Sequence, residues 1–134
     1  MPNPIIFSAI KQDTGSPPIS DGHYIDGFER YLTNYGKSFD LMSGTFTAPR
    51  DGVFEFSATL LSDTYNFAAM AIEKNHNTDI KFRTTYGGGQ NIASFSWITE
   101  LEKGDTIRFR VSKGSFWCGT DYNCVFTGKF IRQS

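Results

Sequence analysis

Two segments of the chain combine aromatic rings with polar side chains, the combination that binds sugars in proteins. An aromatic ring packs on the apolar face of a sugar, while amide, carboxylate and hydroxyl groups bind its hydroxyls. The candidate residues are Trp117, Asp121, Tyr122 and Asn123 in one segment and Arg83, Tyr86, Gln90 and Asn91 in the other. The arginine could also pair with the carboxylate of an acidic sugar such as sialic acid. We take these two segments as the candidate ligand-binding site.

Cys118 and Cys124 enclose most of the first segment. A disulfide between them would close a short ring and stabilise the fold by about 2 kcal/mol. Two free thiols, which would suit a reducing compartment, are the alternative. If the bond forms, Trp117 could pack against it instead of against a ligand. The spacing is not that of paired CxxC motifs, so we do not expect zinc.

Catalytic motifs are missing from the sequence. His23 and His76 lie in turn-rich segments, with no neighbour in sequence that would orient either as a base. There is no GxSxG or HExxH motif, and the glycine run 87–89 lacks the lysine and helix start of a phosphate-binding loop. The chain is therefore not expected to be an enzyme.

Composition excludes two classes of partner. Thirteen basic and fourteen acidic residues give a formal net charge of -1, which does not favour nonspecific binding of nucleic acid. No apolar run approaches the roughly 20 residues of a membrane helix, so membrane insertion is not expected. The start, MPNPIIFSAI, has no export signal. Met1 could be a start codon added to a mature, secreted chain.

Alternating apolar residues predict about ten strands and no helix, which indicates a β-sandwich or barrel. The clearest strand covers 53–61, with Phe54 and Phe56 facing the core, and the turn residues at 48–52 predict a hairpin before it. In the strand near residue 108, we expect Arg108 and Arg110 to face solvent.

Two segments could be strands or helices. Residues 24–32 mix aromatic and charged residues, and two short strands are favoured over a helix. Residues 66–73 contain strong helix formers but lie between turn clusters, so they are read as a strand. Residues 80–85 match them, which predicts a hairpin with its tip at 74–77. A further turn is expected at 34–36.

The order of several motifs resembles a known family. The residues that carry the resemblance are Phe7, Ser8 and Ala9; Thr33, Asn34, Gly36, Phe39 and Asp40; Gly44, Phe46, Pro49, Gly52, Phe54 and Phe56; Leu101, Gly104 and Asp105; and Phe126, Thr127, Gly128, Phe130 and Ile131. Together they resemble the globular head domain of complement C1q, in the C1q and tumour-necrosis-factor superfamily. The resemblance covers about residues 5–131 of a single domain, 1–134. It is strongest to cerebellin-like members and to secreted single-head proteins of invertebrates.

The resemblance implies an all-β, ten-stranded antiparallel jelly-roll sandwich that assembles as a homotrimer and is secreted, its signal peptide removed. No Gly-X-Y repeat occurs, so no collagen stalk is expected in this chain. Some relatives bind calcium, but Asp63, Asp79 and Asp121 lie in different segments and would have to converge to do so. We therefore expect no cofactor, with calcium as the possible exception. Tyr86 could lie in the subunit interface instead of binding a ligand.

The function implied is recognition. The leading hypothesis is a lectin-like or pattern-recognition trimer that binds glycans or microbial surface ligands through its loops, as in innate immunity. One alternative is a signalling or adhesion head of cerebellin type that binds a receptor protein. Another is a structural module whose only task is to form trimers.

Overall fold

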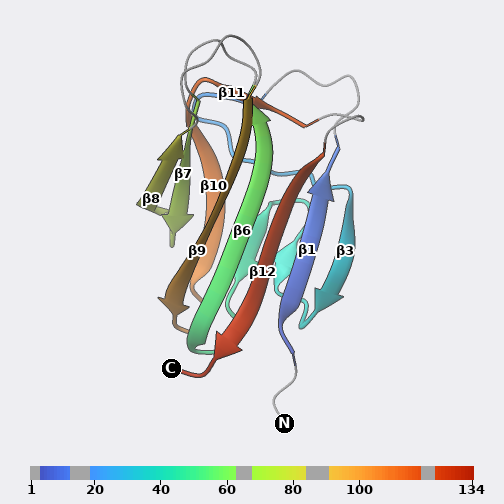
Figure 1. Ribbon diagram of the computed structural model, residues 1–134. Coiled ribbons are helices and arrows are strands. Elements are labelled where there is room, and N and C mark those ends of the chain that lie inside the picture. Colours follow the sequence, from blue (N-terminus) through green and yellow to red (C-terminus); the bar gives the residue numbers. More distant parts are fainter. Residues whose placement is uncertain (1–3, 13–18, 63–67, 84–90, 119–122) are drawn as a thin grey trace.

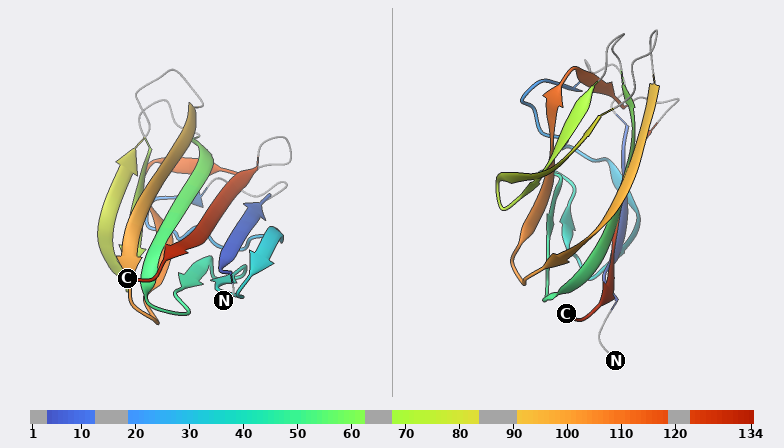
Figure 2. Two further views of the ribbon diagram at one scale, coloured as in Figure 1. Left: turned by 60° about the horizontal axis from the view of Figure 1, so that its bottom comes forward. Right: turned by 60° about the vertical axis from the view of Figure 1, so that its left-hand side comes forward.

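The computed structural model describes residues 4–12, 19–62, 68–83, 91–118 and 123–134. Every regular element in these ranges is a β-strand, and the strands form two antiparallel sheets (Figure 1). The sheets pack face to face as two layers, which the right-hand view of Figure 2 separates. The expected all-β antiparallel sandwich is therefore confirmed. No helix in the described ranges is long and apolar enough to span a membrane.

Seven strands form one sheet and five form the other. The larger sheet has the order β2 (Ile19–Ser20), β11 (Ser115–Trp117), β6 (Gly52–Ser62), β12 (Cys124–Arg132), β1 (Ile6–Lys11) and β3 (Arg30–Tyr35), with β9 (Asn91–Leu101) along the other side of β6. The smaller sheet has the order β4 (Phe39–Asp40), β5 (Thr45–Thr47), β10 (Thr106–Lys113), β7 (Ala69–Lys74) and β8 (Asn77–Arg83). The described residues thus contain twelve strands where about ten were expected, and β2 and β4 are only two residues long.

Aromatic rings from both sheets form the core. Phe54 and Phe56 on β6 are buried as predicted, because alternate residues of a strand face the same side. Phe46 of the smaller sheet packs edge-on against both rings. Phe7 stacks on Phe39 across the sandwich at 4.4 Å between ring centroids. These contacts hold the two layers together.

The predicted hairpin at 48–52 is wrong. β5 pairs with β4 and β10, whereas β6 pairs with β9, β11 and β12, so the reversal carries the chain from one sheet to the other. Turn residues such as Pro49 and Gly52 set a change of direction, but the partner of the next strand depends on distant residues.

The predicted hairpin with its tip at 74–77 is confirmed. β7 and β8 pair antiparallel with a register shift between Ile72 and Glu73, and Ala69 lies opposite Arg83. Asn75 and His76 form the tip with φ of 52° and 72°, the left-handed conformation that two-residue hairpin turns require at both positions.

Residues 24–32 contain the start of only one strand, where two short strands were predicted and a helix was the alternative. Tyr24 makes an isolated bridge to Arg110, and β3 begins at Arg30. The turn expected at 34–36 is also displaced. Asn34 and Tyr35 pair with β1, and the chain turns from Gly36, whose φ is 90°. Asn34 is therefore a strand residue, and this position matters for the cleft described below.

Candidate functional site

Both candidate segments adjoin the same end of β6. Ser62, the last residue of β6, lies opposite Asn91 at the start of β9 and opposite Phe116 in β11 on its other side. Figure 1 shows β11 at the end of the sandwich away from both chain termini. The topology thus brings together two segments that are far apart in sequence.

The smaller sheet ends at the same place. Ala69 of β7 lies opposite Arg83 on one side and opposite Lys113 on the other. Lys113 ends β10 and leads through one glycine to β11. The exposed Arg83 is therefore carried to the end of the sandwich that holds Trp117.

A disulfide closes the first segment. Cys118 and Cys124 are joined, with an S–S distance of 1.97 Å, and both are buried. Cys124 is the first residue of β12 and pairs with Lys11 of β1. The disulfide therefore ties the first candidate segment to β12, a central strand of the larger sheet. Trp117 is half-buried and its backbone oxygen lies 3.4 Å from Cys124 Sγ, whereas Asn123 is exposed.

The remaining candidates lie where the structure gives no side-chain detail. Tyr86, Gln90, Asp121 and Tyr122 fall outside the described residues, and Asn91 is described only as a backbone position in β9. The structure therefore places the strand ends that carry the candidate site, and whether its side chains converge stays a prediction.

Glu73 is the centre of a buried polar cluster between β7 and β10. It accepts hydrogen bonds of 2.7 Å from Tyr24 Oη and from Arg110 Nε. The guanidinium of Arg108 lies over the Tyr24 ring, 3.7 Å from its centroid. Arg108 and Arg110 lie on the outer side of β10, as expected, since they alternate with buried residues, but both are only half-exposed because this cluster holds them.

The same contacts shift the pKa values of Glu73 and Tyr24. Burial raises the pKa of the Glu73 carboxyl, but the hydrogen bonds from Arg110 and Tyr24 outweigh it, so this pKa lies below its ordinary value. The hydrogen bond to Glu73, followed by burial, raises the pKa of Tyr24. Glu73 is thus an ionised structural anchor.

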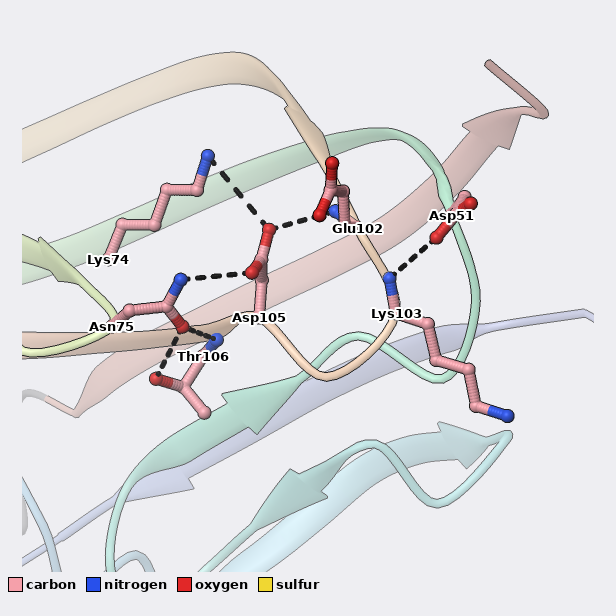
Figure 3. A network of polar contacts seen from close by, with 7 residues as sticks. All are labelled: Asp51, Lys74, Asn75, Glu102, Lys103, Asp105 and Thr106. Carbon is pink, nitrogen blue, oxygen red and sulfur yellow. Dashed lines mark hydrogen bonds and ion pairs between the residues drawn. The ribbon is translucent and has the colours of Figure 1, made fainter.

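A second polar network lies at the opposite end of the sandwich and fastens three turns together (Figure 3). Asp105 accepts hydrogen bonds from Asn75 Nδ2 at 2.9 Å and from the Glu102 backbone N–H at 2.8 Å. Asp51, from the crossover between the sheets, accepts a 2.7 Å bond from the Lys103 N–H. The bonds to Asp105, with Lys74 nearby, lower the pKa of its carboxyl.

One of the three aspartates considered for calcium lies in the described residues: Asp79 is exposed on β8, while Asp63 and Asp121 lie outside the described ranges. Within those ranges, no group of three or more His, Cys, Asp or Glu residues is arranged to hold a metal ion. The expectation of no cofactor, with calcium as the possible exception, stays a prediction.

Neither histidine lies in a site of reaction chemistry. His76 is exposed at the β7–β8 hairpin tip. His23 is also exposed, and its backbone oxygen accepts a 2.9 Å bond from the Val111 N–H.

Sequence reasoning missed a cleft of about 570 Å³ at the side of the sandwich. It opens between β3 and the β4–β5 strands, and its wall includes Asn34, Lys37, Ser38 and Asp40. The signal that could have revealed it is Asn34, a polar residue at an inward-facing position opposite Phe7 of β1.

The comparisons with known proteins agree with this architecture. A family model for the C1q domain matches residues 6–131. The globular domain of zebrafish complement 1qA protein superposes with a TM-score of 0.77 at 17% identity, over 97% of this chain and 99% of that one. The TNF protein Eiger from S. frugiperda gives 0.73 at 10% identity, over 99% and 96%. Murine APRIL gives 0.71 at 9% identity, over 96% and 100%.

Proposed function

The chain belongs to the C1q domain family, whose members are recognition modules, and we propose that it binds glycans or microbial surface ligands as a homotrimer. In this proposal the protein is secreted and has no enzymatic activity. Its ligands bind at the end of the sandwich where β11 and the start of β9 flank β6. The supporting observation is that Ser62 pairs with both Asn91 and Phe116, so the strand ends next to the two candidate segments lie on either side of β6.

The outer face of the larger sheet suits the proposed trimer contact. One row across this face consists entirely of small hydroxyl residues from five strands, paired in register. They are Ser96, Ser57, Thr127, Ser8 and Thr33. Ser8 and Thr127 are hydrogen-bonded to each other at 3.0 Å. Small side chains on a flat sheet allow a second copy to approach closely.

The next row supplies apolar surface beside the hydroxyl row. Ile98, Ile6 and Tyr35 are exposed there, and Ile98 is 61% exposed. Between them, Glu55 and Lys129 form an ion pair at 3.2 Å. An exposed apolar side chain next to polar groups is typical of subunit contacts.

Trimerisation would raise affinity by repetition. Three weak sites on one rigid head gain avidity of about 100-fold or more when the target is also repetitive. We therefore expect strong binding to dense glycan surfaces and weak binding to isolated sugars.

The test is a glycan array with the wild type and a monomeric variant. Ser57→Arg places a long charged side chain in the middle of the hydroxyl row, and Thr78→Arg makes the same change on exposed β8 as a control. We expect light scattering to show a trimer for the wild type and the control, and a monomer for Ser57→Arg. Carbohydrate signal should be strong for the trimers only. No signal above background for any of the three proteins would rule out glycan binding.

A receptor-binding head is the second candidate, and one observation favours it. Leu32 on edge strand β3 is 57% exposed, and Met42 after β4 is 78% exposed. The discriminating result is a tight protein partner whose binding is lost in Met42→Glu but is unchanged by competing sugars.

A further inference from the structure

The side cleft lies between an edge strand of the larger sheet and an edge strand of the smaller sheet. β3 is the last strand of the larger sheet and β4 is the last strand of the smaller one. Figure 1 shows β3 at one side of the molecule. The cleft holds about 570 Å³, within the range of small-ligand sites. It is separate from the loop end used in the proposed function.

Two polar atoms in the wall of this cleft are buried without partners. Asn34 Oδ1 and Ser38 Oγ have almost no exposed surface and no hydrogen-bond partner among the described residues. Ser38 as a whole is only 6% exposed. Buried polar atoms are nearly always hydrogen-bonded, because leaving one unpaired lowers stability. The fold therefore keeps two groups at this position that a ligand could satisfy.

The backbone explains why these side chains line the cleft. Asn34 lies opposite Phe7, a core residue, so it faces the interior of the sandwich. The Ser38 carbonyl accepts a 2.8 Å bond from the Thr47 N–H, which holds the turn after β3 against β5. A serine hydroxyl turns about χ1, so Oγ can reach toward the cleft without any backbone movement.

Asp40 adds a charged acceptor. Its Oδ2 accepts hydrogen bonds from Ser43 Oγ at 2.6 Å and from the Ser43 N–H at 2.9 Å. These two bonds lower the pKa of the Asp40 carboxyl, so it is ionised at neutral pH. Oδ1 accepts no hydrogen bond from the described residues and is available to a ligand.

The unpaired groups determine the class of ligand. Asn34 Oδ1 and Asp40 Oδ1 accept hydrogen bonds, and Ser38 Oγ can accept or donate one. A matching ligand carries several O–H or N–H donors close together, as the adjacent hydroxyls and acetamide of a sugar do. The hydroxyls of Thr45 and Thr47 extend the same chemistry along the cleft.

We propose that this cleft is a second saccharide subsite on each subunit, an inference that rests on the proposed glycan binding. The cleft wall carries both the Asp40 carboxylate and the Lys37 ammonium, so neutral sugars as well as acidic ones suit its charge.

Removing the Ser38 hydroxyl separates a binding role from a structural one. A hydroxyl that stabilises the fold lowers the thermal midpoint when it is removed. An unpaired hydroxyl kept for a ligand does not, so Ser38→Ala should keep or raise the midpoint. Its sugar affinity should nevertheless fall about tenfold, the effect of one lost hydrogen bond to a ligand.

The experiment is a titration of the isotope-labelled full chain with chitobiose, lactose and sialyllactose, followed by amide chemical shifts. We expect sugar binding in the cleft to shift amides between residues 34 and 43. Ser38→Ala and Asp40→Asn should weaken this binding about tenfold, while the exposed control Thr78→Ala matches the wild type.

The possible outcomes distinguish the two proposals. Shifts confined to the ends of β8, β9 and β11 overturn the cleft subsite and leave the proposed loop function standing. Shifts confined to residues 34–43 support the subsite and count against the loops. A loss of thermal stability in Ser38→Ala with unchanged affinity overturns the subsite, because the hydroxyl is then structural. No shift with any sugar overturns both.

Discussion

Glu73 on β7 reaches diagonally across to Arg110 on β10, and its Oε2 accepts a 2.7 Å hydrogen bond from Arg110 Nε. Its other oxygen accepts a bond from Tyr24 Oη. Residues 22–25 also form backbone hydrogen bonds with β10. The Ile25 N–H donates to the Phe109 carbonyl oxygen at 2.9 Å. The ion pair thus helps to fasten an irregular segment alongside β10 of the smaller sheet.

Glu73→Gln should destabilise the protein by about 2–3 kcal/mol, because it removes the partner of a charge that is mostly withdrawn from water. The Glu73 side chain is 6% exposed and that of Arg110 is 29% exposed. Urea denaturation at neutral pH measures the change. Both changes are compared in the monomeric Ser57→Arg variant, where the matched control is Glu55→Gln, whose exposed pair with Lys129 should contribute less than about 1 kcal/mol. Equal effects of the two changes would show that the Glu73 cluster is not a structural anchor.

Stability should fall on acidification, through three carboxyls whose pKa values are lowered in the fold: Asp40, Glu73 and Asp105. A lowered pKa means that the unfolded chain binds more protons than the folded one as the pH falls. The stability these groups contribute is therefore complete above their ordinary pKa values, near 4, and is lost below them. Urea denaturation between neutral pH and about pH 3 should show this decline.

Asp105→Asn isolates one contribution to that decline. The variant should be less stable at neutral pH and should lose less stability on acidification, since it has no carboxyl to protonate. Asn75→Ala removes the main hydrogen bond that lowers the pKa of Asp105, so it should flatten the same part of the curve. An acid slope identical to that of the wild type in both variants would show that this pKa is not lowered.

Local patterns in the sequence predicted individual strands well. The alternation over 53–61 identified the inward face of β6, and the turn residues at 74–77 identified the β7–β8 hairpin. Both features depend on neighbours in the chain. Pairing between distant strands does not depend on neighbours in the chain. The turn residues at 48–52 therefore predict a hairpin, although the chain crosses there from one sheet to the other.

The candidate binding sites also differ in whether local sequence patterns or distant strand pairing reveal them. Aromatic and polar residues marked the loop segments, and the fold then brought their strands to one end. The side cleft gave no such local signal. Asn34, Gly36 and Ser38 look like ordinary turn residues until the pairing of β3 with β1 turns Asn34 inward and the bond from Thr47 holds Ser38 in place.

Reducing the Cys118–Cys124 disulfide should destabilise the protein by about 2 kcal/mol, because the bond closes a short loop in the unfolded chain. Thermal unfolding of Cys118→Ala/Cys124→Ala measures the effect. Alanine is used because both sulfurs are buried and a serine hydroxyl there would have to find a partner. The mass with and without reductant should differ by two hydrogens. An unchanged mass would show that the thiols are free in the isolated protein.

Gly128→Ala should be strongly destabilising, because this glycine lies where β12 passes between two core rings. A β-carbon at residue 128 would lie 2.4 Å from Phe7 Cε1 and 2.8 Å from Phe56 Cδ1. Both rings are packed against further aromatic side chains and cannot move aside freely. Overpacking of this kind costs about 1–3 kcal/mol or more.

Gly104→Ala is the matched control for steric crowding. Its φ is 93°, but nothing lies within 4 Å of an added β-carbon, so only backbone strain of about 1–2 kcal/mol is expected. Thermal and urea unfolding of the two variants should therefore rank Gly128→Ala as the less stable. Gly128→Ala should also disturb the NMR signals of the Phe7 and Phe56 rings, which Gly104→Ala should leave unchanged. The reverse ranking would mean that the core around β12 can relax to accept a methyl group.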